Sequence, residues 1–135
     1  MSNIKTMITA HPNPTDGLDV DKLVAALEAA TACAQACTAC ADACLAEDAV
    51  AEMRNCIRTD LDCADICATT VAVLSRRTGS NLTVVRAQLN ACIAACLACA
   101  EECERHADHD EHCRLCAEAC RRCEKACIEL LATIS

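Results

Sequence analysis

Cysteines spaced three, four or seven residues apart are the feature that most constrains this chain. Steps of this size return to the same face of an α-helix, so each run predicts one helix with a stripe of sulfur. Sixteen of the 135 residues are cysteine, and they form four such runs. Four stripes that face one another predict a helical bundle with a thiol-lined core that serves as the binding site. The runs are Cys33, Cys37, Cys40 and Cys44; Cys56, Cys63 and Cys67; Cys92, Cys96, Cys99 and Cys103; and Cys113, Cys116, Cys120, Cys123 and Cys127.

The remaining composition favours long helices. Phe, Tyr and Trp are absent, and both prolines, Pro12 and Pro14, lie near the N-terminus. The chain beyond them is therefore free of strong helix breakers apart from Gly17 and Gly79. We predict an all-α fold: an N-terminal leader over residues 1–17, then an up-down-up-down antiparallel four-helix bundle over residues 18–135. Short connections make neighbouring helices antiparallel, with helices expected at 18–46, 49–76, 82–106 and 108–133.

Short polar side chains mark the expected helix starts. Arg76 and Arg77 are expected in the last turn of the second helix, just before Gly79. The expected N-terminal caps are Asp16 or Asp19, Asp48, Ser80 or Asn81, and Asp108 paired with Glu111.

Charge and hydropathy exclude several classes of partner. The formal net charge of -8 argues against nucleic acid and against anionic membrane surfaces. Glu28, Glu101 and Glu102 interrupt the most apolar runs, so no membrane-spanning segment is expected. The first ten residues lack the apolar region of a secretory signal, which predicts a cytoplasmic protein with reduced thiols. Disulfides are the rival interpretation, but disulfide-dense domains are rich in loops, Gly and Pro.

Sulfur on straight helices favours one metal over others. Thiolate selects Cu(I), zinc or iron–sulfur clusters, and the last two usually take cysteines from loops. Cu(I) accepts two or three sulfurs, and a thiolate can bridge two ions, so we predict about one Cu(I) per cysteine, or about 16 per chain. Equal numbers of thiolates and monovalent ions also leave the buried core neutral. An iron–sulfur electron carrier and a zinc buffer are the alternatives.

Other candidate ligands gather near one end of the expected bundle. That end collects Glu47, Glu52, Met53, His106, His109 and His112, and it is the predicted entrance for metal. The alternative to a ligand role is a solvent-exposed helix connection for the three histidines. For Met53 the alternative is ordinary packing. Asp60 takes a stripe position between Cys56 and Cys63, which predicts a ligand or a histidine partner unless the helix rotates it to solvent. The opposite end is expected to be an aliphatic plug of Leu23, Ala26, Thr70, Val85, Leu89, Leu130 and Leu131.

Segments 32–48, 53–67, 96–106 and 111–127 resemble the cytosolic branch of the copper storage protein family. The resemblance implies a homotetramer of bundles, each storing many Cu(I) ions on inward-facing cysteines and loaded at a histidine-bearing mouth. All sixteen cysteines match those inward positions, and no catalytic activity is implied. A copper chaperone or a small-molecule chelator is the expected partner. Ala26 and Ala30 stand where some relatives extend the sulfur stripe, which predicts lower capacity at the closed end.

Overall fold

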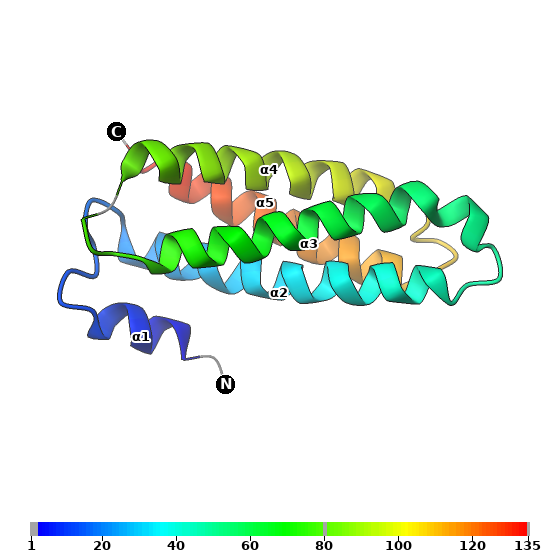
Figure 1. Ribbon diagram of the computed structural model, residues 1–135, viewed down its shortest axis with the longest axis horizontal. Coiled ribbons are helices and arrows are strands. Elements are labelled where there is room, and N and C mark those ends of the chain that lie inside the picture. Colours follow the sequence, from blue (N-terminus) through cyan, green and yellow to red (C-terminus); the bar gives the residue numbers. More distant parts are fainter. Residues whose placement is uncertain (1–2, 80, 135) are drawn as a thin grey trace.

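The structure is a computed structural model that describes residues 3–79 and 81–134. The regular elements of these residues are all helical, and the four long helices pack side by side in the cyclic order α2, α3, α4, α5, with neighbours antiparallel (Figure 1). The all-α four-helix-bundle prediction is therefore confirmed. The elements are α1 (Ile4–Ala10), α2 (Val20–Leu45), the 3-10 helix η1 (Val50–Met53), α3 (Arg54–Ser75), α4 (Leu82–Glu104) and α5 (Glu111–Leu131).

Two helix starts follow the predicted caps. The Asp19 side chain accepts a hydrogen bond from the backbone N–H of Lys22 at 2.9 Å and caps α2. Asn81 caps α4 in the same way, accepting from the N–H of Val84 at 3.3 Å. Each cap satisfies one backbone N–H that the helix itself leaves unpaired. The alternative cap Ser80 lies outside the described residues.

The other two starts differ from the prediction. Asp48 does not cap the second helix, because the chain first crosses the end of the bundle as η1, buries Met53 there, and begins α3 only at Arg54. Asp108 does not begin the fourth helix either, because successive turns around His106 delay its start. The N-cap of α5 is Asp110, without a side-chain hydrogen bond.

Arg77 lies beyond α3, although the sequence placed it in the last helical turn. The helix ends at Ser75, and the extended backbone of Arg76 leads the chain away. The Arg77 side chain is only 1% exposed, and its Nη1 donates to the carbonyl oxygen of Thr15 at 3.5 Å. Burial lowers the pKa of Arg77, an effect that the nearby Asp16 opposes. The guanidinium therefore ties the leader to the α3–α4 connection.

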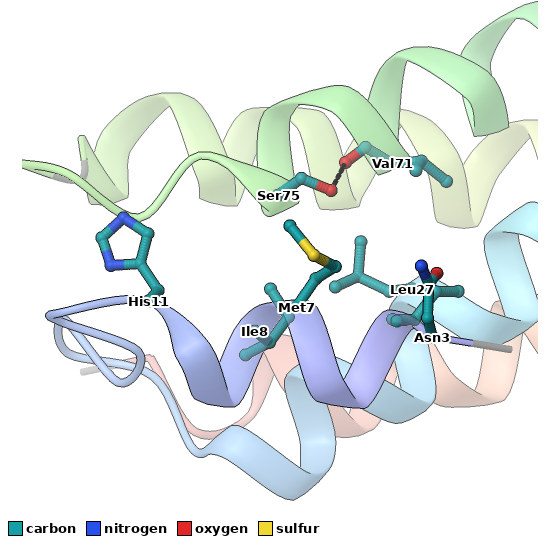
Figure 2. Close-up of a pocket in the computed structure, with 8 residues that line it drawn as sticks. Asn3, Met7, Ile8, His11, Leu27, Val71 and Ser75 are labelled. Atoms are coloured by element: carbon teal, nitrogen blue, oxygen red, sulfur yellow. Dashed lines mark hydrogen bonds between the residues drawn. The ribbon is translucent and has the colours of Figure 1, made fainter.

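The leader contains the short helix α1, which lies against the bundle (Figure 1). Ile8 of this helix is buried. A groove of about 320 Å³ separates α1 from Leu27 of α2 and Val71 of α3 (Figure 2). The His11 ring lies at one end of this groove. Its Nδ1 accepts from the backbone N–H of Asn13 at 2.9 Å, which leaves Nε2 to donate to the Thr78 hydroxyl at 3.3 Å.

The bundle core changes composition along its length. Sulfur fills most of it, whereas aliphatic side chains close the end beside the leader. Fully or almost fully buried residues at that end are Leu23, Ala26, Leu27, Thr70, Leu74, Val85, Leu89 and Leu130. Leu131, which was also expected there, is half-buried. The aliphatic plug thus forms the floor of the sulfur-lined tube.

Two helices, α2 and α4, are long and apolar enough to cross a membrane by length and composition alone. The sequence prediction of no such segment relied on uninterrupted apolar runs, which is a stricter criterion than average hydropathy. Alanine and cysteine supply most of this hydropathy, and the inner faces of both helices carry sulfur stripes into the bundle core. The hydropathy of these two helices therefore reflects the alanine and cysteine of the bundle.

Candidate metal-storage core

All sixteen cysteines are free thiols, and none is more than 1% exposed. Each stripe occupies the inner face of its helix, so the four stripes meet along the bundle axis. Hydrogen-bonded Sγ atoms lie 3.7–4.0 Å apart, as for Cys33 and Cys120 at 3.7 Å and Cys44 and Cys56 at 4.0 Å. A disulfide requires about 2.05 Å, so these are contacts between separate thiols. The fold therefore contains separate thiols and not the disulfides of the alternative interpretation.

The sulfurs form overlapping groups of four in which every ligand atom lies within 4.8 Å of the others. Neighbouring groups share members, so one thiolate can bridge ions in two groups, as bridged Cu(I)–thiolate chemistry requires. Along the axis, four of these groups are Cys37, Cys99, Cys116 and Cys120; Cys33, Cys37, Cys63 and Cys120; Cys33, Cys63, Cys67 and Cys96; and Cys67, Cys92, Cys96 and Cys123.

Asp60 points into this core and is fully buried. The Cys99 thiol donates to its Oδ1 at 3.0 Å, and Cys103 and Cys116 each lie 3.4 Å from the same oxygen. Burial raises the pKa of Asp60 to about 12, and Cys116 and Cys99 add to the effect, so the carboxyl is protonated at neutral pH. The structure thus places Asp60 among the sulfurs rather than at the surface or beside a histidine.

Neighbouring thiols share protons through their hydrogen bonds. Hydrogen bonding with Cys103 lowers the pKa of Cys40 to about 6 and that of Cys116 to about 2. The pKa of Cys103 is raised by the same two interactions. Burial is the main cause of the raised pKa of Cys44 and Cys113. These interactions thus lower the pKa of Cys40 and Cys116 and raise that of Cys103, and a thiol with a lowered pKa binds a soft cation more readily.

His112 is the histidine that reaches the sulfur core. Its Nδ1 lies 3.5 Å from the Cys40 sulfur and 3.6 Å from that of Cys113, and its Nε2 lies 3.6 Å from the Glu47 carboxylate. Burial acts to lower the pKa of His112, but Cys40 and the carboxylates of Asp110 and Glu47 raise it overall. His112, Cys40, Cys44 and Cys113 form a further group of four close ligand atoms, at the histidine-bearing end.

The other predicted rim residues take different positions. His106 turns toward Glu102, whose carboxylate lies 3.5 Å from its Nε2, and His109 is exposed in the connection before α5. Met53 is buried at this end of the bundle, and Glu52 is exposed. Sequence reasoning missed the burial of Glu102, which is 6% exposed. Glu102 lies three residues after Cys99, and this helical spacing was the sequence signal that could have indicated its burial.

These features define the class: a helical bundle with a cysteine-rich core able to hold several metal ions. Residues 19–132 match the sequence profile of a family described as "Copper storage protein". The chain belongs to the copper storage protein family. Family membership indicates storage rather than catalysis.

Solved structures and a curated relative are similar over most of the chain. A copper storage protein from Streptomyces lividans loaded with 10 copper equivalents is 53% identical, with a TM-score of 0.95, covering 97% of this chain and 99% of that one. A structure of a cytosolic copper storage protein from the same organism with five coppers is 60% identical, with a TM-score of 0.82, covering 83% and 93%. An uncharacterized cysteine-rich protein, YhjQ of Bacillus subtilis, is 41% identical over 108 residues, covering 80% and 94%.

Proposed function

We propose that this protein stores Cu(I) in the cytoplasm on its core thiolates, at about one ion per cysteine and about 16 per chain. The observation that carries the proposal is the overlap of the four-sulfur groups. Cys33 and Cys63 belong to two neighbouring groups, and so do Cys67 and Cys96. Shared thiolates let the number of ions exceed the number of separate four-ligand sites, which a set of isolated tetrahedral centres does not allow.

Charge supports a monovalent cargo. The tube has sixteen thiols, and the one carboxyl among them, Asp60, is protonated at neutral pH. Sixteen monovalent ions neutralise sixteen thiolates, whereas sixteen divalent ions leave a large positive charge in a buried core. Each thiol that binds copper releases its proton, so loading is expected to acidify an unbuffered solution.

Loading begins, in this proposal, at the histidine-bearing end of the tube. His112 lies against Cys40 and Cys113 with Nδ1 toward the sulfurs, and its buried Nε2 lies 3.6 Å from the Glu47 carboxylate. The ligand roles of Asp60, His106, His109 and Met53 stay predictions. We expect a copper chaperone or a small-molecule chelator to supply the ion, and we expect the chain to assemble as a homotetramer, as the family resemblance implied.

The decisive experiment is an anaerobic Cu(I) titration of the reduced protein against a competing chelator, followed by thiolate charge-transfer absorption in the ultraviolet. Saturation well above four equivalents supports storage on shared thiolates, whereas saturation at about four matches isolated tetrahedral sites and refutes it. A parallel titration with zinc tests the buffer alternative. Inorganic sulfide and visible absorption in the purified protein test the iron–sulfur alternative.

A further inference from the structure

Glu47 lies close to His112 at the histidine-bearing end of the bundle. It follows the last turn of α2, where its backbone N–H donates to the carbonyl oxygen of Cys44 at 3.2 Å. Cys44 and His112 belong to the same group of four close ligand atoms. The backbone of Glu47 is thus held by the turn that carries one ligand of this group, while its side chain lies beside another.

The two ring nitrogens of His112 have different surroundings. Nδ1 lies 3.5 Å from the Cys40 sulfur and 3.6 Å from the Cys113 sulfur. Nε2 is buried and has no hydrogen-bond partner among the residues that the structure describes. The Glu47 carboxylate lies 3.6 Å from this nitrogen, slightly beyond hydrogen-bond distance. One nitrogen therefore faces sulfur, and the other faces a carboxylate.

This arrangement determines which nitrogen of His112 is available to a metal ion. A neutral imidazole carries its proton on one nitrogen and offers a lone pair on the other. Nδ1 binds Cu(I) only when the proton is on Nε2, and a buried Nε2–H needs an acceptor. The Glu47 side chain is 39% exposed, so it is free to close on Nε2 without disturbing the core. Metal-binding histidines commonly donate their second ring N–H to such a carboxylate.

The other histidine–carboxylate pair at this end is built differently. The Nε2 of His106 lies 3.5 Å from the carboxylate of Glu102, which comes four residues earlier in the chain. Glu102 also accepts a hydrogen bond from Arg105 at 2.9 Å, so its charge is shared. Glu47 and His112, in contrast, join the end of α2 to the first turn of α5. Their contact therefore fixes the ring relative to the sulfurs of both helices.

We propose that Glu47 is a positioning residue for copper uptake, which accepts the Nε2–H of His112 and so directs the Nδ1 lone pair at the incoming Cu(I) beside Cys40 and Cys113. The proposal rests on the storage function and on loading at the histidine-bearing end. Uptake exchanges one ligand of the copper donor for Nδ1. Copper keeps its oxidation state, any proton on Nδ1 passes to the departing ligand or to water, and Nε2 keeps its proton.

The tautomer of His112 is measured in the reduced, metal-free protein. Long-range proton–nitrogen NMR correlation, at a pH above the pKa of His112, shows which ring nitrogen carries the proton, and His112→Ala identifies the signals. We expect the proton on Nε2 in the unmodified protein and a mixture of both tautomers in Glu47→Ala. A proton on Nδ1 in the unmodified protein, or the same tautomer in Glu47→Ala, would overturn the proposal.

Uptake is followed anaerobically by stopped-flow ultraviolet absorption, with Cu(I) supplied as its bis-bicinchoninate complex. Glu47→Ala should load about tenfold more slowly, as expected for the loss of a carboxylate that orients a histidine ligand, with the final capacity unchanged. Glu47→Gln should keep most of the rate, because its amide oxygen also accepts from Nε2. The matched control is Glu52→Ala, which removes the same charge from an exposed position at the same end and should load like the unmodified protein.

A double variant separates positioning from direct capture of copper by the carboxylate. In the His112→Ala background, Glu47→Ala should cause no further slowing, because a positioning residue acts only through its partner. Further slowing there would overturn the proposal. So would an unchanged rate in Glu47→Ala, equal slowing in Glu52→Ala, or a Glu47→Gln variant as slow as Glu47→Ala, since the last two results would mean that charge alone matters.

Two measurements keep these results interpretable. Far-ultraviolet circular dichroism checks the fold of each variant, and Glu47→Leu, which keeps the bulk without an acceptor, replaces Glu47→Ala if that variant fails the check. The Cu(I) capacity of the unmodified protein tests the storage function separately. A capacity of about four ions or fewer would overturn storage itself, whereas a normal capacity with an unchanged tautomer and rate in the Glu47 variant would overturn only the role of Glu47.

Discussion

Replacing Asp60 by asparagine separates the buried carboxyl's charge from its shape. In the fold this carboxyl keeps its proton up to a pKa of about 12, because burial and the thiols of Cys116 and Cys99 disfavour the ionised form. In the unfolded chain it loses the proton near its ordinary pKa of about 3.9. Between these two values the folded state binds one proton more than the unfolded state. The free energy of unfolding therefore falls as pH rises, by up to about 1.4 kcal/mol per pH unit from this group.

Asparagine has a similar shape and no proton to lose. Asp60→Asn should therefore match the wild type in stability near pH 4 and exceed it by as much as about 4 kcal/mol at pH 7, in the metal-free reduced protein. Guanidinium unfolding followed by circular dichroism, in chelator-containing reducing buffer from about pH 5 to about pH 8, measures the difference.

Asp65→Asn is the matched control, since Asp65 is exposed on the same helix. It should change stability by no more than about 0.5 kcal/mol at any of these pH values. A stability difference between Asp60→Asn and the wild type that stays constant across the range, or that shrinks as pH rises, would refute a protonated Asp60. Such a result would mean that the carboxylate is ionised and compensated by its neighbours.

Three further outcomes follow from the core. Cys37→Ala should lower the Cu(I) capacity by about one to two ions, because this sulfur belongs to two groups; an unchanged titration endpoint would contradict sharing. His112→Ala should slow loading, and His109→Ala should not, since only His112 contacts core sulfur; equal rates in stopped flow would remove the distinction. Leu89→Ala, at a fully buried plug position, should lower the free energy of unfolding by about 2–5 kcal/mol. Val84→Ala, at a half-exposed position, should lower it by less than about 1 kcal/mol, and chemical unfolding measures both.

The helices could be predicted because the signal for them is local. Cysteine steps of three, four and seven residues and the scarcity of Gly and Pro fix the helical faces, and Asp19 and Asn81 supply recognisable caps. The helix connections could not be predicted in the same way. Met53 delays the start of α3 by packing on the bundle end, and Arg77 leaves α3 to lie under the leader. Both depend on contacts between segments that are distant along the chain.

The residues of the candidate site also divide into those that local periodicity predicts and those that depend on the path of the chain. The sixteen cysteines and Asp60 face the core because a helix repeats its faces regularly, which the sequence displays directly. His109 was expected within the fourth helix, but it precedes α5, so helical periodicity does not place it. The separation of His112, beside sulfur, from His106, beside Glu102, depends on the path of the α4–α5 connection.

The continuity of the sulfur contacts has a consequence for the order of withdrawal. Contacts of 4.0 Å or less run without a break from Cys44 and Cys56 through Cys103, Cys99, Cys37, Cys33, Cys63, Cys67 and Cys92 to Cys127. A bound ion can advance by exchanging one sulfur for the next, and cross-contacts such as Cys63–Cys96 and Cys67–Cys123 join the stripes into a branched network. The aliphatic floor makes the far end a dead end. Sulfurs beside the floor, such as Cys127, are consequently filled and emptied only through the rest of the network.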